Sequence, residues 1–333
     1  MIGLEDVFAE EAKQILGSVG QLELGKGRVF FTAPLEAMYE LNIRARTLHK
    51  LFLLLHRGLF EGLRDIYVAT RQLDFTSVIK PDQSFAVRAE RVGQHDFTSM
   101  DVAAEVGQAV IDSYMASTGV RLKVNLSEPD VELYAFVRDN EFLLGINTTG
   151  PSLHKRGYRV FKHPAALRTS VAAAMLLLAG WRGDGLLLDP MCGGGTIPIE
   201  GALMARRIPP AAFRRGQPAL LSLPIADEEE FRERLERALG ERIDDIFNIV
   251  GMDKFRAYLE GARRNARSAG VEDTIRFVQG DATDLASYLR DSPTHVVTNP
   301  PYGIRLRLRG LFRLYRGFLS SLASLAPGCR LVL

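Results

Sequence analysis

The sequence is poor in the residues that build disulfide frameworks and metal centres. Its 333 residues include two cysteines, Cys192 and Cys329, and six scattered histidines. This scarcity argues against a disulfide framework and against a zinc site, and we expect no bound metal. The sequence also has no apolar run of membrane-spanning length and no charged-then-apolar leader, which disfavours membrane insertion and secretion. The cytoplasm is therefore the expected location.

The net charge says little about partners, because 42 basic and 40 acidic residues leave only +2. Local clusters are more informative. Basic residues gather without any acid in residues 152–163, 206–215 and 305–316. One such stretch is usually a solvated surface, but three in or near the same half of a chain favour a polyanionic partner.

From about Thr169 onward, short apolar runs alternate with helical patterns, which is typical of a parallel α/β sheet. The predicted strands are residues 186–189, 248–253, 275–281, 295–299 and 329–333. Helices are expected between them, for example at 196–207 and 254–270, the second closing at Gly270 as a C-cap. This half therefore predicts a doubly wound fold.

The first 150 residues follow a different pattern, in which short helices and strands are mixed. Residues 5–16 and 99–118 predict amphipathic helices, and strand-like runs flank the second of them at 84–93 and 131–150. Small α+β units are the expected architecture. Because this half has no glycine-rich phosphate loop and no catalytic cluster, we interpret it as a recognition module.

The first predicted strand of the second half ends in the sequence DPMCGGGTIPIEGA. Asp189 stands at the strand end, three glycines form a turn, and a helix is expected from about Thr196. Ligands of open parallel sheets bind at the carboxyl ends of the strands, where glycines permit close approach and a helix N-terminus offers free N–H groups. The spacing fits neither G-x-G-x-x-G nor a P-loop, so a dinucleotide or ATP site is disfavoured.

Two more acids fall at the ends of the next strands, Asp253 in VGMDK and Asp281 in QGDATD. Their carboxylates could accept hydrogen bonds from a ribose diol and an exocyclic amine, which favours a ligand containing a nucleoside. The alternative is that each Asp only caps the helix that follows it. Because three acids stand at the ends of successive strands beside a glycine turn, we favour a ligand site over three separate helix caps.

The fourth predicted strand runs into Asn299-Pro300-Pro301-Tyr302, and a strand cannot continue through two prolines. The exposed parts suit a planar base: Tyr302 can stack on it, while the Asn299 side-chain oxygen and the Pro300 carbonyl can accept from its amino group. Two such acceptors would favour the pyramidal form of the amine and free its lone pair for attack on a methyl group. The alternative for Tyr302 is structural packing over the turn.

Together, DPMCGGGTIPIEGA, VGMD, GDATD and NPPYGIRL resemble the S-adenosylmethionine-dependent RNA methyltransferases that join a THUMP domain to a Rossmann-like domain. The similarity extends to GQHDFTSMDVAAEVG, FLLGINTTGPSLHKRGYR and ARRIPPAAFRR, and is strongest to the TrmN-type enzymes that make N2-methylguanosine in the tRNA acceptor stem, with RlmL as a relative. NPPY alone is shared with DNA-adenine and protein-glutamine methyltransferases, so the THUMP-like front half is what indicates RNA. Relatives have Ser where this chain has Gly194, a mild departure.

The resemblance implies a role for each motif. The methionine moiety of the cofactor would contact Asp189, Cys192, Gly193, Gly195 and Thr196. Asp253 would bind the ribose and Asp281 the adenine amine, while Asn299, Pro300, Pro301 and Tyr302 would hold the target guanine, with Asn299 also facing the cofactor. Basic residues of the joint, Lys155, Arg156 and Arg159, would contact RNA phosphates.

The resemblance also implies a domain order, and we expect the protein to be a monomer. The expected parts are a ferredoxin-like piece at 1–50, a THUMP domain at 51–150, a basic linker at 151–165 and a Rossmann-like methyltransferase domain at 166–333. Relatives have a strand before the segment corresponding to MIGLEDVF and a hairpin after the fifth strand, so we expect this sequence to be clipped at both ends or to be an incomplete gene model.

Several alternatives stay open. The substrate could be ribosomal RNA or a different tRNA guanosine, and DNA adenine is a less favoured target. The protein could also be a non-catalytic RNA-binding protein that keeps the cofactor fold as a scaffold. Cys192 as a nucleophile for pyrimidine C5 methylation is disfavoured, because that chemistry needs a cysteine where Tyr302 stands.

Overall fold

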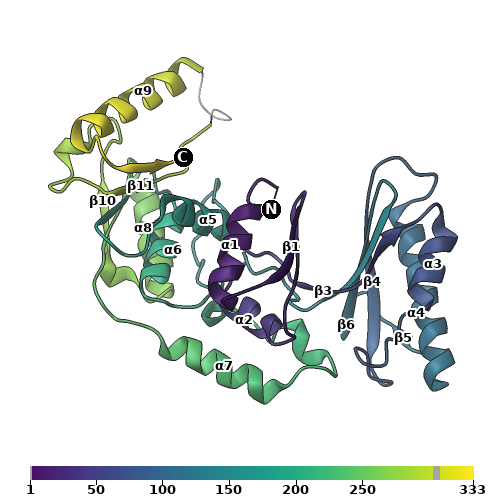
Figure 1. The fold of residues 1–333 in the computed structure, drawn as a ribbon. Helices are drawn as coiled ribbons and strands as arrows, with labels where there is room; N and C mark the ends of the chain where they lie inside the picture. Colours follow the sequence, from purple (N-terminus) through teal and green to yellow (C-terminus); the bar gives the residue numbers. More distant parts are fainter. Residues whose placement is uncertain (1, 303–307) are drawn as a thin grey trace. The chain divides into compact units, whose positions relative to one another are not determined.

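The structure is a computed structural model that describes residues 2–302 and 308–333 (Figure 1). The chain forms two compact units. Unit 1 consists of Met1–His49, Leu153–Arg215 and Arg234–Leu333, and unit 2 consists of Lys50–Ser152 and Gly216–Glu233. Each unit therefore combines segments that are far apart in the sequence.

A five-stranded parallel sheet forms the centre of unit 1. Its strand order is β10-β9-β8-β11-β12, and every neighbouring pair is parallel. The strands are β8 (Leu186–Asp189), β9 (Asn248–Asp253), β10 (Ile275–Gln279), β11 (His295–Val297) and β12 (Arg330–Val332). All five predicted strands are present, although β10 and β11 each end two residues earlier than predicted. The doubly wound prediction is confirmed.

The strands are apolar throughout because both faces of the sheet are covered. Leu187 packs into one hydrophobic cluster, together with Ile249, whereas its neighbours Leu186 and Leu188 pack into a second cluster with Phe318. Successive side chains of a strand point to opposite faces, so each strand contributes to both clusters. This packing fixes the level at which each strand ends.

The helices of unit 1 follow the predicted pattern (Figure 1). Helices are α1 (Glu5–Leu16), α2 (Ala37–Arg44), α5 (Thr169–Ala179), α6 (Thr196–Ala205), α8 (Arg256–Ser268) and α9 (Leu308–Leu325). An antiparallel pair, β1 (Gly20–Gly25) and β2 (Arg28–Thr32), lies between α1 and α2 in the chain. Helix α7 (Glu228–Gly240) belongs to the 206–247 insert between α6 and β9.

Unit 2 is an α+β structure, as predicted. Its sheet order is β3-β7-β6-β4-β5, with strands β3 (Phe52–Leu59), β4 (Ser84–Val92), β5 (Lys123–Val124), β6 (Val131–Arg138) and β7 (Glu141–Asn147). Helices α3 (Leu63–Arg71) and α4 (Ser99–Thr118) contribute to its single core. Helix α4 begins at a capping box between Thr98 and Asp101 and ends at Gly119 in the left-handed conformation, which explains its predicted bounds.

The strand order of unit 1 reverses between β8 and β11. The chain runs outward from β8 through β9 to β10, and then returns to the other side of β8 with β11 and β12. Ligands of such sheets bind at the carboxyl ends of the strands beside this reversal. The ends of β8 and β11 are Asp189 and the segment that leads to Asn299, which are the two predicted site motifs. No described helix is long and apolar enough to cross a membrane.

Candidate cofactor and substrate site

Hydrogen bonds from backbone N–H groups join the carboxyl ends of three strands in unit 1. The Cys192 N–H donates to the Met252 carbonyl at 2.8 Å, and the Gly193 N–H donates to Asp253 Oδ2 at 2.9 Å. The Gly280 N–H donates to the Asp253 carbonyl at 3.1 Å. The turns after β8, β9 and β10 therefore form one connected edge, and the predicted cofactor motifs meet there.

Asp189 is a buried carboxylate at this edge, with 2% of its surface exposed. Burial raises the pKa of Asp189 to about 7, and the Met191 N–H, which donates to Asp189 Oδ1 at 3.2 Å, opposes the rise. A buried carboxyl group close to half-protonation at neutral pH is costly for folding. A cationic ligand group beside it would restore the charged form.

The glycine turn after β8 needs glycine for two reasons. Gly193 and Gly195 have φ values of 51° and 78°, a region that side chains disfavour. A Cβ on Gly193 would also lie 3.3 Å from the His163 ring, and a Cβ on Gly195 would lie 3.0 Å from Ala262 Cβ. Gly195 is the N-cap of α6, and Thr196 is its first residue. The turn therefore needs glycine both for its backbone conformation and for the small space beside it.

Asp253 and Asp281 keep acceptor capacity at the ends of β9 and β10. Asp253 Oδ1 accepts from the Phe255 N–H at 2.9 Å, and its other oxygen accepts from Gly193. Asp281 accepts from the Thr283 N–H and hydroxyl and pairs with Lys254 at 3.0 Å. The Thr283 bonds, followed by Lys254, hold the pKa of Asp281 below its ordinary value. Both oxygens of Asp253, and Oδ2 of Asp281, accept one hydrogen bond each and keep a second lone pair for a ligand hydroxyl or amine, whereas Oδ1 of Asp281 accepts two bonds from Thr283.

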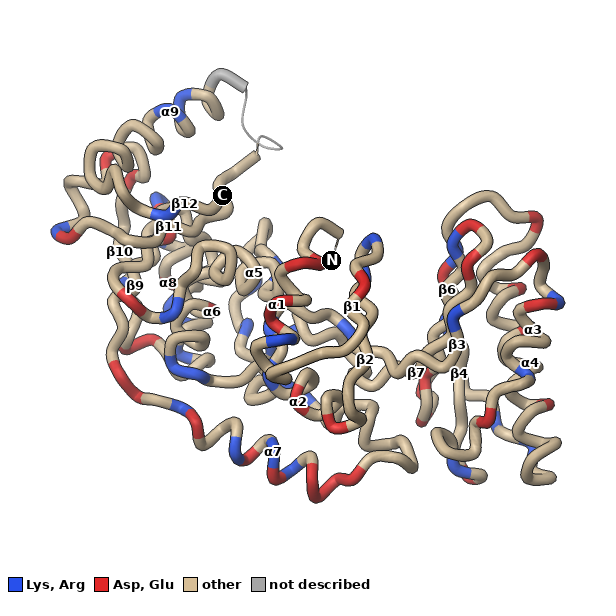
Figure 2. The backbone as a smooth tube through the Cα atoms, viewed as in Figure 1, with Lys and Arg blue, Asp and Glu red and all other residues tan. Residues whose placement is uncertain are grey.

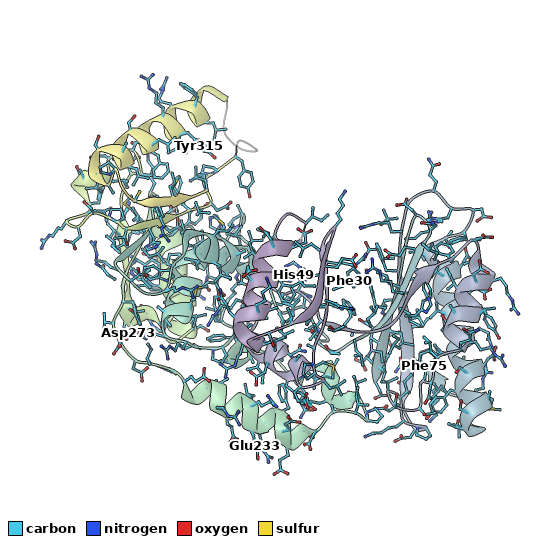
Figure 3. The ribbon with its side chains drawn as sticks, viewed as in Figure 1. Phe30, His49, Phe75, Glu233, Asp273 and Tyr315 are labelled. Carbon is cyan, nitrogen blue, oxygen red and sulfur yellow. The ribbon has the colours of Figure 1, made fainter. Side chains whose placement is uncertain are left out.

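The Asn299-Pro300-Pro301-Tyr302 segment leaves β11 at the same edge of the sheet. Asn299 is half-buried and Pro300 is buried, whereas Tyr302 is 63% exposed. Tyr315 of α9, labelled in Figure 3, donates its hydroxyl to the Pro301 carbonyl at 3.4 Å. The aromatic face of Tyr302 is thus available to a ligand, and the exposure disagrees with a structural role in packing over the turn.

The Cys192 thiol is buried and unsuited to nucleophilic attack. Burial raises the pKa of this thiol well above its ordinary value, and Asp189 and Asp253 raise it further. The thiolate is the nucleophilic form of cysteine, so a raised pKa suppresses its reactivity. Cys192 is a small residue of the turn, as the sequence favoured.

The three predicted phosphate-binding residues have different surroundings. Lys155 is exposed. Arg156 is 5% exposed; it donates to the carbonyls of Leu153 and Arg46 and lies 3.6 Å from Glu200. Because this guanidinium is buried and bonded within the protein, Arg156 is not among the proposed RNA contacts.

Arg159 is half-buried and is bound within unit 1. It donates to the Leu167 carbonyl and, at 3.1 Å, to the Thr196 hydroxyl. Its guanidinium therefore supports the first residue of α6, at the glycine turn. A phosphate contact by Arg159 stays a prediction.

Sequence reasoning assigned residues 159–163 to a basic linker and missed that this segment packs against the glycine turn. Asn265 of α8 accepts from the Phe161 N–H at 2.7 Å and donates to the carbonyls of Phe161 and Gly194 at 3.1 and 3.0 Å. A Cβ on Gly261 would overlap the Phe161 ring. The Gly261 and Asn265 pair, one helical turn apart, was the available signal, but only the tertiary structure identifies what it contacts.

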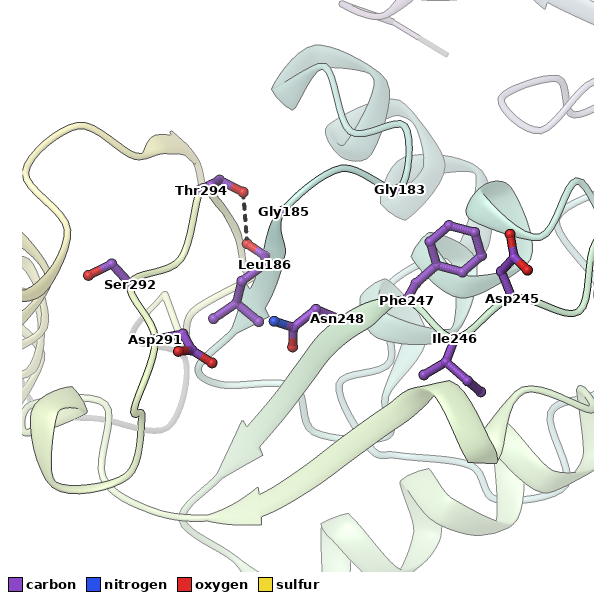
Figure 4. Close-up of a pocket in the computed structure, with 10 residues that line it drawn as sticks. All are labelled: Gly183, Gly185, Leu186, Asp245, Ile246, Phe247, Asn248, Asp291, Ser292 and Thr294. Atoms are coloured by element: carbon purple, nitrogen blue, oxygen red, sulfur yellow. Dashed lines mark hydrogen bonds between the residues drawn. The ribbon is translucent and has the colours of Figure 1, made fainter.

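A separate pocket of about 740 Å³ lies at the opposite ends of the strands (Figure 4). It is lined by residues that precede β8, β9 and β11, including Gly185, Phe247 and Asp291. The Thr294 hydroxyl donates to the Leu186 carbonyl at 3.2 Å beside it. This pocket contains none of the predicted site residues. Among residues 2–302 and 308–333, no cluster of three or more His, Cys, Asp or Glu could hold a metal ion.

The strand order, the glycine turn and the acids at the strand ends define a Rossmann-like methyltransferase unit. Family models match in the same order along the chain: an RlmL ferredoxin-like domain at residues 1–52, a THUMP domain at 61–147 and an RMKL-like methyltransferase domain at 156–333. The chain belongs to the THUMP-containing family of S-adenosylmethionine-dependent RNA guanine-N2 methyltransferases.

Curated relatives cover nearly the whole chain. A tRNA (guanine(6)-N2)-methyltransferase of Methanocaldococcus jannaschii is 43% identical over 98% of this chain and 86% of its own length. The enzyme of the same name from Archaeoglobus fulgidus is 44% identical over 95% of this chain and 76% of its own length. A ribosomal RNA large subunit methyltransferase K/L of Saccharophagus degradans is 33% identical over 91% of this chain, but only 41% of its own length.

Solved structures show the same fold. The structure of SMU.472 complexed with SAH has a TM-score of 0.87 and 26% identity, covering 97% of this chain and 85% of its own. TrmN from Thermus thermophilus has a TM-score of 0.69 and 28% identity, covering 98% of this chain and 83% of its own.

The residues of the edge fit S-adenosylmethionine, the cofactor of this family. Two glycines with positive φ form a turn without side chains, and a buried carboxyl group with a raised pKa lies beside them. Asp253 and Asp281 supply acceptors for a ribose and an amine. The role of each residue toward the cofactor stays the prediction made from the sequence.

Proposed function

We propose that this protein methylates the N2 amino group of a guanosine in the acceptor stem of tRNA, at position 6. The single observation that carries the proposal is the display of Asn299-Pro300-Pro301-Tyr302 at the same sheet edge as the glycine turn and the three aspartates. The tRNA substrate and the position are supported by two relatives, 43% and 44% identical, that are named for guanine(6) of tRNA. With tRNA as the substrate, the cytoplasm is the proposed location.

Four residues would hold the target base. The Asn299 side-chain oxygen and the Pro300 carbonyl accept the two hydrogens of the guanine amino group, and Tyr302, 63% exposed, stacks on the ring. The two prolines fix the backbone, so little ordering is needed when the base arrives. Held in this way, the amine presents its lone pair toward the cofactor and needs no strong base beforehand.

The protein's remaining task is to orient the cofactor. Bound S-adenosylmethionine supplies an electrophilic methyl group on a sulfonium centre. Asp253 accepts from the ribose hydroxyls and Asp281 from the adenine amine, while the Gly193 to Thr196 turn packs against the methionine moiety. Asp189 can balance the positive charge of the sulfonium centre. Burial makes the isolated carboxylate unfavourable, so a nearby cation stabilises its charged form.

The decisive experiment measures the methylated nucleoside. The protein is incubated with labelled S-adenosylmethionine and, separately, unmodified tRNA or ribosomal RNA, and the RNA is digested to nucleosides. Label in N2-methylguanosine from tRNA supports the proposal, and a tRNA in which the position-6 base pair is reversed should lose the label. Label in neither RNA from a folded, cofactor-binding protein would overturn it.

Asn299→Ala is the matched catalytic control. Loss of one acceptor for the amine should reduce kcat by roughly 10²–10³, by analogy with removal of one polar group in other active sites. Affinity for RNA should change little, because the substitution removes no charge that contacts phosphate. Equal losses of RNA affinity and of kcat would contradict the role given to Asn299.

Ribosomal RNA is the second candidate substrate. It is favoured by the relatives named ribosomal RNA large subunit methyltransferase K/L, which are 33% and 29% identical to this chain. In the same experiment, N2-methylguanosine formed only in ribosomal RNA would establish this alternative in place of tRNA.

A further inference from the structure

The end of the chain around the target-base segment is basic and free of acid. Residues 292–333 contain six arginines and no lysine, aspartate or glutamate. Helix α9 lies in this stretch, and Figure 2 shows basic positions on it, all of them arginines, but no Asp or Glu. The whole chain is nearly neutral, so the excess of positive charge in residues 292–333 is a local feature.

The two faces of α9 have different composition. Phe318 and Leu322 are buried in the core cluster on one face of the sheet. On the other side of the helix, Phe312 is 70% exposed, and Arg313 and Arg316 are exposed as well. Residues three and four positions apart are neighbours on a helix surface, so these three side chains form one patch. We call Phe312, Arg313 and Arg316 the α9 face.

Helix α9, which carries the α9 face, contacts the target-base segment through Tyr315. Tyr315, which is adjacent to Arg316 in the helix, donates its hydroxyl to the Pro301 carbonyl at 3.4 Å. Phe312 precedes Tyr315 by three residues, a rise of roughly 4.5 Å along the helix axis. The patch is therefore within about one helical turn of the residue that contacts the Asn299-Tyr302 segment, where the base is proposed to bind.

We infer that the α9 face binds the RNA strand next to the target guanosine, with Arg313 and Arg316 contacting phosphates and Phe312 stacking on a neighbouring base. This inference rests on the proposed function and adds a substrate contact to it. Nucleic acid is the partner because it combines the two features the patch matches: phosphates that pair with guanidinium groups and aromatic bases that stack. A protein surface would need acids and an apolar pocket together.

The test uses the whole protein and compares charge removal at two places. Arg313→Gln with Arg316→Gln removes two charges from the α9 face. Arg182→Gln with Arg290→Gln is the matched control, since both arginines are exposed and precede β8 and β11, at the other ends of the strands. RNA affinity is measured in an Asn299→Ala background over a range of salt concentrations, and KM for tRNA with Asn299 intact.

The α9 variant should raise both the Kd and the KM for tRNA at least about tenfold. The logarithm of the association constant falls as the logarithm of the salt concentration rises, and this slope should become shallower by about 1.4 to 1.8, as expected for two lost phosphate contacts. The control should stay within about twofold. Affinity for S-adenosylmethionine should not change in either variant. An α9 variant that matches the control in Kd and slope overturns the inference.

A second variant tests the stacking contact and protects against a folding artefact. Phe312→Ala should weaken RNA binding by about tenfold, and Phe312→Tyr should restore it because its ring can also stack. Equal affinity of the Ala and Tyr variants would contradict the role of Phe312. If wild-type protein methylates no tRNA guanosine, the proposed function fails, while the affinity measurements still decide whether the α9 face binds RNA.

Discussion

At the scale of single residues, the carboxyl group of Asp189 links stability to cofactor binding. Its pKa is about 7 in the folded protein, against 3.8 for an ordinary Asp. Between these values the folded state holds a proton that the unfolded state releases, so this group's contribution to the free energy of unfolding falls as pH rises from about 4 to about 7. The cost above pH 7 is about 4 kcal/mol.

We therefore expect Asp189→Asn to stabilise the protein at high pH. Relative to wild type, the variant should gain up to about 4 kcal/mol at pH 8 and little at pH 4, because the neutral amide has no charge to desolvate. Its affinity for S-adenosylmethionine should fall at least about tenfold, since a charge-balancing group is lost. Urea unfolding at both pH values and calorimetric titration measure these effects; an equal change in stability at pH 4 and pH 8 would contradict the assignment.

The buried thiol of Cys192 should be chemically inert in the native protein. Its pKa is raised by burial and by the two nearby acids, so the thiolate fraction at neutral pH is very small. We expect iodoacetamide to leave Cys192 unmodified in the folded protein and to alkylate it after unfolding in urea. Mass spectrometry of peptides checks both states. Alkylation of the native protein at the rate of a free thiol would reopen covalent catalysis.

At the scale of elements, α8 joins the segment 159–163 to the glycine turn through one side chain. The Asn265 amide makes three hydrogen bonds, to the Phe161 N–H, the Phe161 carbonyl and the Gly194 carbonyl. An aspartate has the same shape, but its carboxylate cannot donate to either carbonyl. The element that follows β9 thereby sets the position of the turn that follows β8.

Asn265→Asp should consequently weaken S-adenosylmethionine binding by at least about tenfold and reduce stability by roughly 2–3 kcal/mol, because one buried and one partly buried carbonyl lose their donor. Ser268→Ala, an exposed position on the same helix, is the control. Calorimetric titration and thermal unfolding report the two effects. An unchanged cofactor affinity would show that the hydrogen bonds of Asn265 do not set the position of the turn.

At the scale of the whole molecule, each of the two compact units is built from segments that are not consecutive in the sequence. The N-terminal segment Met1–His49 belongs to unit 1 together with the methyltransferase segments, and Gly216–Glu233 belongs to unit 2. Glu11, buried on α1, accepts from the N–H groups of Arg46 and Thr47 at 2.6 and 3.0 Å. Arg46 in turn donates to the carbonyl of Ile208 at 2.8 Å, just beyond the end of α6.

This chain of hydrogen bonds predicts that a substitution in α1 lowers the local stability of α6. Glu11→Ala leaves buried N–H groups without their acceptor and should cost roughly 2–4 kcal/mol. Amide hydrogen exchange should speed up in α1, in residues 45–48 and in α6, while α4 of unit 2 should exchange as in wild type. Uniform acceleration in both units would show that they unfold as one cooperative body, contrary to this expectation.

The sequence by itself determined the local features of this protein. Apolar runs fixed the five strands of unit 1, and the acids and prolines at their ends marked the site, because strands must stop where a glycine turn or two prolines leave the ladder. The domain boundaries and the role of each site residue stay predictions.

Only the tertiary structure decided which polar side chains are exposed to a ligand and which are bonded within the protein. Arg156 looked like a phosphate contact in a basic stretch, yet it is buried beside Glu200. Asn265 looked like an ordinary helical residue, yet it holds the glycine turn. The physical reason is the same in both cases. Burial and hydrogen bonding depend on partners that lie tens to more than a hundred residues away, and local sequence carries no record of which partner packs there.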